Sequence, residues 1–68
     1  MKTNEINNPK HYTFGTIEPI QVIEDWNLSF NLGNVIKYVA RSEHKGQRQM
    51  DLEKAVFYLQ RELKNIKN

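Results

Sequence analysis

The 68-residue sequence contains no cysteine, two histidines (His11 and His44) and no long apolar run. Without cysteine the chain gains no stability from disulfides, and a zinc site would have to use the two histidines without any thiolate. We therefore expect no metal site and no cofactor. No stretch approaches the roughly 18 apolar residues of a membrane-spanning helix, and the N-terminus lacks the apolar segment of a signal peptide. These absences favour a cytosolic protein without a membrane partner.

Length and charge set two further limits. A domain of about this size buries only about 60% of the surface of its unfolded chain, so it needs well-packed helices or self-association. We therefore predict a homo-oligomer. The net charge of +2 favours anionic partners but is far from that of a protein that coats DNA. Because lysines and arginines fall on several predicted faces and no recognition helix stands out, we do not expect a nucleic-acid partner.

Apolar residues recur at helical spacing in three segments, which predicts an all-α fold. The first helix is expected over about 17–26, with Thr16 as N-cap and Pro19 in its first turn. The second is expected over about 30–43 after Ser29, with Gly46 closing it, and the third over about 51–65. The sequence thus predicts an N-terminal extended arm (1–15) and a small bundle of about three helices (16–68).

The third predicted helix carries a regular apolar seam. Its apolar residues alternate spacings of four and three, as in a heptad repeat: Leu52, Val56, Leu59, Leu63 and Ile66. Such a seam could pack on the second helix, on a symmetry-related copy, or on both. Gly33, inside the second predicted helix, costs roughly 1 kcal/mol against alanine. It indicates either the close approach of another group or simple tolerance.

The second predicted helix carries a polar stripe on its other face. The stripe combines three cations, an aromatic ring and an amide at spacings of three and four: Asn34, Lys37, Tyr38, Arg41 and Lys45. Cations bind phosphate, a tyrosine ring stacks on a base, and an amide bonds a base or sugar edge. The stripe therefore suits a phosphorylated ligand that bears a ring. An ordinary solvated helix face would also look like this.

The third predicted helix repeats this combination with Lys54, Tyr58 and Arg61, for which a salt-bridged surface is the alternative. The chain lacks the phosphate loop and other common nucleotide and hydrolase motifs. Its neighbouring acids, Glu24 with Asp25 and Asp51 with Glu53, do not form the clusters that an all-α, magnesium-dependent pyrophosphatase uses. We therefore assign no catalytic residue.

Two blocks carry a family resemblance: "NPKHYTFGTIEPIQVIEDWNLSFNLGNVIKYVARSEHKG" and "DLEKAVFYLQREL". Their motifs are N-P-x-H-Y, I-E-x-I-x-V-I, G-N-x-I-K-Y-x-x-R with a following K-G, and D-L-x-K-A-x-x-Y-L. From about Asn8 to Leu63 the chain resembles a small bacteriophage family of uncharacterised function, often labelled SaV-like. The family is related to part of a longer podovirus nucleotide kinase that lacks a phosphate loop. The resemblance implies a phage protein in the cytoplasm of an infected bacterium, and nucleotide binding more than phosphoryl transfer.

The residues and the resemblance together predict a phage protein that binds a nucleotide or cyclic nucleotide. Its use would be to sequester a nucleotide, such as an immune signal of the host, in pockets of a homo-oligomer. The arm around "NPKHYTFG" would form a second wall of the pocket. The expected ligand-binding residues are Asn8, Lys10, His11, Tyr12, Asn34, Lys37, Tyr38, Arg41 and Lys45. The alternatives are an enzyme like a nucleoside monophosphate kinase and a protein-binding module that acts on a host factor.

Overall fold

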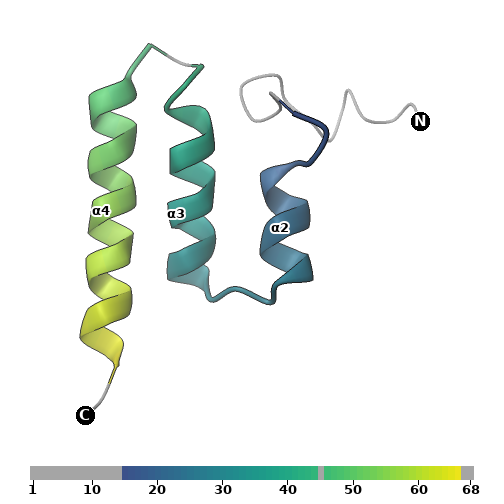
Figure 1. The fold of residues 1–68 in the computed structure, drawn as a ribbon. Coiled ribbons are helices and arrows are strands. Elements are labelled where there is room, and N and C mark those ends of the chain that lie inside the picture. The colour runs from purple at the N-terminus through teal and green to yellow at the C-terminus, as the bar shows by residue number, and fades with distance from the viewer. Residues whose placement is uncertain (1–14, 45, 67–68) are drawn as a thin grey trace.

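Three helices form a single layer in the computed structural model, which describes residues 15–44 and 46–66 (Figure 1). They are α2 (Pro19–Asp25), α3 (Phe30–Arg41) and α4 (Arg48–Asn65), with α3 in the middle. Neighbouring helices run antiparallel, and the Cα atoms span only 15 Å in the thinnest direction. The all-α prediction is confirmed for the described residues. No helix among them is both long and apolar enough to cross a membrane.

The start of α2 differs from the prediction. The N-cap is Glu18 and not Thr16, because Glu18 and Gln21 form a reciprocal capping box in which the Gln21 side chain accepts a hydrogen bond from the Glu18 backbone N–H at 2.8 Å. Pro19 occupies the first helical position, as predicted. The helix ends at Asp25, and Asn27 turns the chain with a positive φ of 54°.

The start of α3 agrees with the prediction. The Ser29 hydroxyl oxygen accepts a hydrogen bond from the backbone N–H of Leu32 at 3.1 Å, which satisfies one donor of the first turn. The same hydroxyl donates to Oε1 of Glu62 at 2.9 Å, so the cap also ties α3 to the far end of α4.

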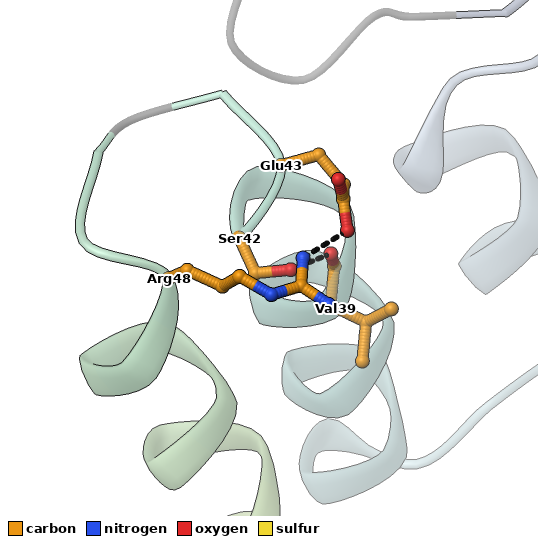
Figure 2. A network of polar contacts seen from close by, with 4 residues as sticks. All are labelled: Val39, Ser42, Glu43 and Arg48. Atoms are coloured by element: carbon orange, nitrogen blue, oxygen red, sulfur yellow. Dashed lines mark hydrogen bonds and ion pairs between the residues drawn. The ribbon is translucent and has the colours of Figure 1, made fainter.

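The connection between α3 and α4 begins earlier than expected and also ends earlier. The last residue of α3 is Arg41, and α4 starts at Arg48 rather than at 51. Figure 2 shows two contacts at this connection: the Ser42 hydroxyl donates back to the Val39 carbonyl at 2.7 Å, and the Arg48 side chain forms an ion pair with Glu43. Gly46, expected to close the helix, lies within the connection with a φ of 76°.

The seam of α4 does not face α3. The helix turns a different row toward α3, in which Asp51 and Ala55 are buried, Tyr58 stacks on Tyr38, and Glu62 bonds Ser29. Leu59 and Leu63, in contrast, are 43% and 63% exposed. The interface between α3 and α4 is therefore narrow and partly polar, and the seam is left without a partner among the described residues.

The contact between α2 and α3 explains Gly33. A Cβ atom at this position would lie 3.2 Å from Cγ2 of Ile23, which is tighter than ordinary van der Waals contact. The close approach that the glycine indicated therefore comes from a side chain of α2. Among the described residues, the buried hydrophobic residues are Ala40 and Ala55, so the layer has almost no core of its own.

Candidate functional site: a basic–aromatic face

The polar stripes of α3 and α4 meet on one side of the layer. Tyr38 of α3 and Tyr58 of α4 stack with ring centroids 6.0 Å apart and an angle of 8° between the rings. The stacked pair brings Lys37 and Arg41 of α3 close to Lys54 of α4. In the sequence, the connection between the two helices separates Lys54 from the other two cations. We call the residues Lys37, Tyr38, Arg41, Lys54 and Tyr58 the basic–aromatic face.

Three cations surround the ring of Tyr38. The Lys54 Nζ lies 5.3 Å from the ring centroid, the Arg41 Cζ 5.4 Å and the Lys37 Nζ 5.6 Å. A cation over a ring face is attracted by the ring's electrons, although at an exposed position this is worth only about 0.5–1 kcal/mol. The three cations repel one another, so the ring offsets part of the repulsion and holds them in one place.

One cation of the group has a buried acid beside it. The Arg41 Nε lies 3.6 Å from Oδ1 of Asp51, whose side chain has an exposed fraction of 0% against 20% for Arg41. Neither carboxylate oxygen of Asp51 accepts a hydrogen bond from the described residues. A buried carboxylate needs a counter-charge, so the pair fixes the guanidinium of Arg41 at the edge of the face.

The two lysines differ from Arg41. Within residues 15–44 and 46–66, neither Lys37 nor Lys54 forms an ion pair with an acid. The Arg61 Cζ lies 5.9 Å from the centroid of the Phe57 ring, and Arg61 likewise forms no ion pair with an acid of the described residues. The alternative of a salt-bridged surface is therefore not what the described residues form. The face carries an excess of positive charge that a bound anion would neutralise.

An apolar hollow borders the face on the side of α2. It has a volume of about 230 Å³ and is lined by Ile23, Leu28, Ser29, Phe30, Gly33, Asn34 and Lys37. The Phe30 ring is 78% exposed and meets the edge of Tyr58, with centroids 6.1 Å apart. The Asn34 side-chain N–H donates to the Phe30 carbonyl at 3.0 Å, so the amide oxygen of Asn34 stays available to a ligand.

Four predicted site residues lie along this side of α3: Asn34, Lys37, Tyr38 and Arg41. The other five lie outside the described residues and stay predictions: Asn8, Lys10, His11, Tyr12 and Lys45. The expected set left out four residues of this region. Lys54 and Tyr58 were considered as a second stripe but not included, Phe30 was taken only as the start of a helix, and Asp51 was taken as the start of the third helix and half of a possible acid pair. The signal for Asp51 was its spacing of four and seven from Ala55 and Tyr58, which predicts a shared row.

The chemistry of the site favours binding. It offers cations and aromatic rings, while the carboxylate nearest to it is buried against Arg41. No group of three or more His, Cys, Asp or Glu side chains that could hold a metal occurs in the described part of the chain. The described residues therefore provide positive charge and apolar contact, which recognise an anion with a ring attached.

Three comparisons complete the picture. A family model described as a protein of unknown function (DUF3310) matches residues 6–60, which is most of the chain. The match covers all five residues of the basic–aromatic face. A search of curated proteins found no significant match, and a search of solved structures found none either.

Proposed function

The chain belongs to the DUF3310 family, and we propose that it is a phage protein that binds a phosphorylated nucleotide and acts as a homo-oligomer that sequesters it. The ligand would be a nucleotide of the infected bacterium, such as a nucleotide immune signal. The observation that carries the proposal is the set of three cations around Tyr38, drawn from two helices. The resemblance to phage proteins described above points the same way.

The phosphate is expected to lie over the cations. Lys37 and Lys54 come from different helices, and the Nζ atoms of both lie within 6 Å of the Tyr38 ring centroid. A phosphate bound beside this ring could therefore contact both lysine side chains. Arg41 would offer a charged group held in place by Asp51. A phosphate neutralises several cations at once, and the charge-assisted hydrogen bonds that it accepts are about twice as strong as neutral ones.

The base is expected at Phe30. The sequence suggested Tyr38 for stacking, but the Tyr38 ring already contacts Tyr58 and three cations. Phe30 is more exposed, and the hollow beside it is apolar and borders Lys37. A base on Phe30 would leave its phosphate pointing toward Lys37, and the Asn34 oxygen could accept from a base or sugar group.

A panel of ligands tests the proposal. Purified protein is heated with nucleoside mono- and triphosphates, cyclic dinucleotides and ADP-ribose derivatives, and the melting temperature is followed. A ligand of the native state stabilises it by about 2.7 kcal/mol at a hundredfold excess over Kd. We expect a rise with at least one nucleotide and none with the matching nucleoside. If no nucleotide raises the melting temperature, the proposal is wrong.

The same samples separate sequestration from catalysis. A sequestering protein returns the nucleotide unchanged after heat release. Turnover of a nucleoside monophosphate with ATP would instead make the protein an enzyme of the kinase type. A host protein retained by the chain in the absence of any nucleotide effect would favour the protein-binding alternative.

Phe30→Ala is expected to weaken the binding of the base without changing the binding of the phosphate. Loss of one stacking platform costs about 1–3 kcal/mol per base in proteins that stack bases, or roughly a tenfold weaker affinity. Binding of inorganic triphosphate should not change, because it has no base. Isothermal titration with both ligands measures the two effects. Ile20→Ala is the control, since Ile20 is an exposed apolar residue that does not line the hollow. Equal losses for both ligands would contradict the placement of the base.

A further inference from the structure

The layer has a second side, which is apolar. Successive residues of a helix are about 100° apart, so Lys54 lies on one side of the row that α4 turns toward α3, and the seam lies on the other. By the same spacing Val39 lies on the side of α3 away from Lys37 and Arg41. Next to it, a hollow of about 410 Å³ runs between α2 and α3, lined by Ile17, Pro19, Val22, Trp26, Ile36, Val39 and Ala40.

We infer that this apolar side packs against a second copy of the chain, with the α4 helices of the two copies antiparallel along their seams. The seam is Leu52, Val56, Leu59, Leu63 and Ile66, and it contains no charged residue. The inference shares the expectation of a homo-oligomer with the proposed function, but it does not depend on a nucleotide, because the basic–aromatic face lies on the other side.

Two observations favour a second copy over another partner. The first is the heptad spacing of the seam, which pairs best with a helix of the same spacing. In a two-fold antiparallel pair, Leu52 meets Leu63 of the other copy, and Val56 meets Leu59. The four seam residues within α4 therefore each find an apolar partner, and this part of the surface is complementary to itself, as a two-fold interface requires.

The second observation is the missing core. Domains bury their apolar faces between two packed layers, whereas this structure has one layer with a thickness of 15 Å. The apolar side carries large hydrophobic residues that are each more than 40% exposed, among them Ile17, Trp26, Val39, Val56, Leu59 and Leu63. A second layer on the apolar side would supply the core that Ala40 and Ala55 alone do not form.

Charge substitution on the seam tests the inference. Leu59→Lys is expected to convert the wild-type oligomer into smaller species by sedimentation at high micromolar concentration, because it would bury an ammonium group in the interface. Met50→Lys is the matched control: Met50 is 49% exposed, lies off the seam of the same helix and should not alter assembly. If Leu59→Lys loses its helical circular dichroism, Leu63→Lys near the end of α4 replaces it. A monomeric wild type, or equal effects of seam and control variants, would overturn the inference.

Single cysteines determine the orientation, since the natural sequence has none. In the antiparallel pair Leu63 lies about 16 Å along the axis from Leu63 of the other copy, beyond the roughly 7 Å between Cα atoms that a disulfide spans. Leu52→Cys and Leu63→Cys should therefore each stay uncrosslinked alone and form a disulfide when mixed under oxidation. Disulfides within each variant alone would show a parallel pair and overturn the antiparallel arrangement. These readouts need no nucleotide, so they remain informative even if the panel of ligands finds none.

Discussion

Replacing Arg41 by alanine is expected to unfold most of the protein at room temperature. Asp51 is fully buried, and Arg41 is the cation beside it, with Nε and Oδ1 3.6 Å apart. Removing one partner of a buried ion pair costs about 3–5 kcal/mol, because it leaves an uncompensated charge inside the protein. A single core of this size rarely supplies more than about 3–5 kcal/mol in total. The expected loss is as large as the total free energy of unfolding. Circular dichroism and urea unfolding should therefore detect little native protein.

A double variant separates the buried charge from the lost contacts. Arg41→Met combined with Asp51→Val removes both charges and replaces them with apolar side chains of similar size. Such replacements of a buried pair are often neutral or stabilising. The double variant should therefore unfold at a higher urea concentration than Arg41→Ala, although it lacks the same guanidinium. If the Arg41→Ala variant is as stable as the wild type, the Arg41–Asp51 pair contributes little to the free energy of unfolding. Arg41 would then be an ordinary surface cation.

Removing both lysines of the basic–aromatic face is expected to weaken nucleotide binding about a hundredfold without unfolding the protein. A hydrogen bond to a charged group contributes about 1.5–3 kcal/mol, and 1.4 kcal/mol corresponds to a factor of ten in affinity. Lys37→Ala with Lys54→Ala removes two such contacts to the phosphate. Neither lysine has an acidic partner among the described residues, so stability should change by little.

Isothermal titration of the nucleotide that raises the melting temperature most is the measurement for this prediction. Lys64→Ala serves as the control, since it removes an exposed lysine from the last turn of α4, outside the face. The double variant should also show a weaker dependence of affinity on salt, because fewer cations contact the phosphate. An unchanged affinity in the double variant, with full helical content, would place the nucleotide elsewhere on the molecule.

Local sequence signals predicted the helices well and their boundaries less well. Ser29 and Pro19 stand at the positions that capping chemistry assigns to them, and three helices follow from apolar spacing alone. Thr16 failed as an N-cap because Glu18 and Gln21 form a capping box closer to the helix. An N-cap preference ranks residue types but does not decide between two candidates two residues apart.

The packing of α4 shows what periodicity cannot decide. The seam residues Leu52 and Leu59 form the more hydrophobic stripe, yet the row that contains Asp51 and Ala55 faces α3. The small side chain of Ala55 is buried in this row, and the Arg41–Asp51 and Ser29–Glu62 contacts fix its register. These contacts join residues far apart in the sequence, so a single-helix pattern does not reveal them.

For the same reason, only part of the candidate site could be predicted from the sequence. A stripe on one helix predicts which residues share a face, and Asn34, Lys37, Tyr38 and Arg41 do share one. That Lys54 and Tyr58 join them depends on the pairing of α3 with α4, as does the contact of Phe30 with Tyr58. Residues 1–14 of the arm that was expected to cover the stripe lie outside the described residues, so the place of the arm over the site stays a prediction.

Isothermal titration of the wild-type protein with one nucleotide and with its nucleoside tests the central claim most directly. The nucleotide is the one that raises the melting temperature most in the panel. We predict saturable binding of the nucleotide, and binding of the nucleoside at least about a hundredfold weaker, since the cations around Tyr38 contact only the phosphate. Equal affinities for the two ligands, or saturation by neither, would contradict the account of the basic–aromatic face as a nucleotide site.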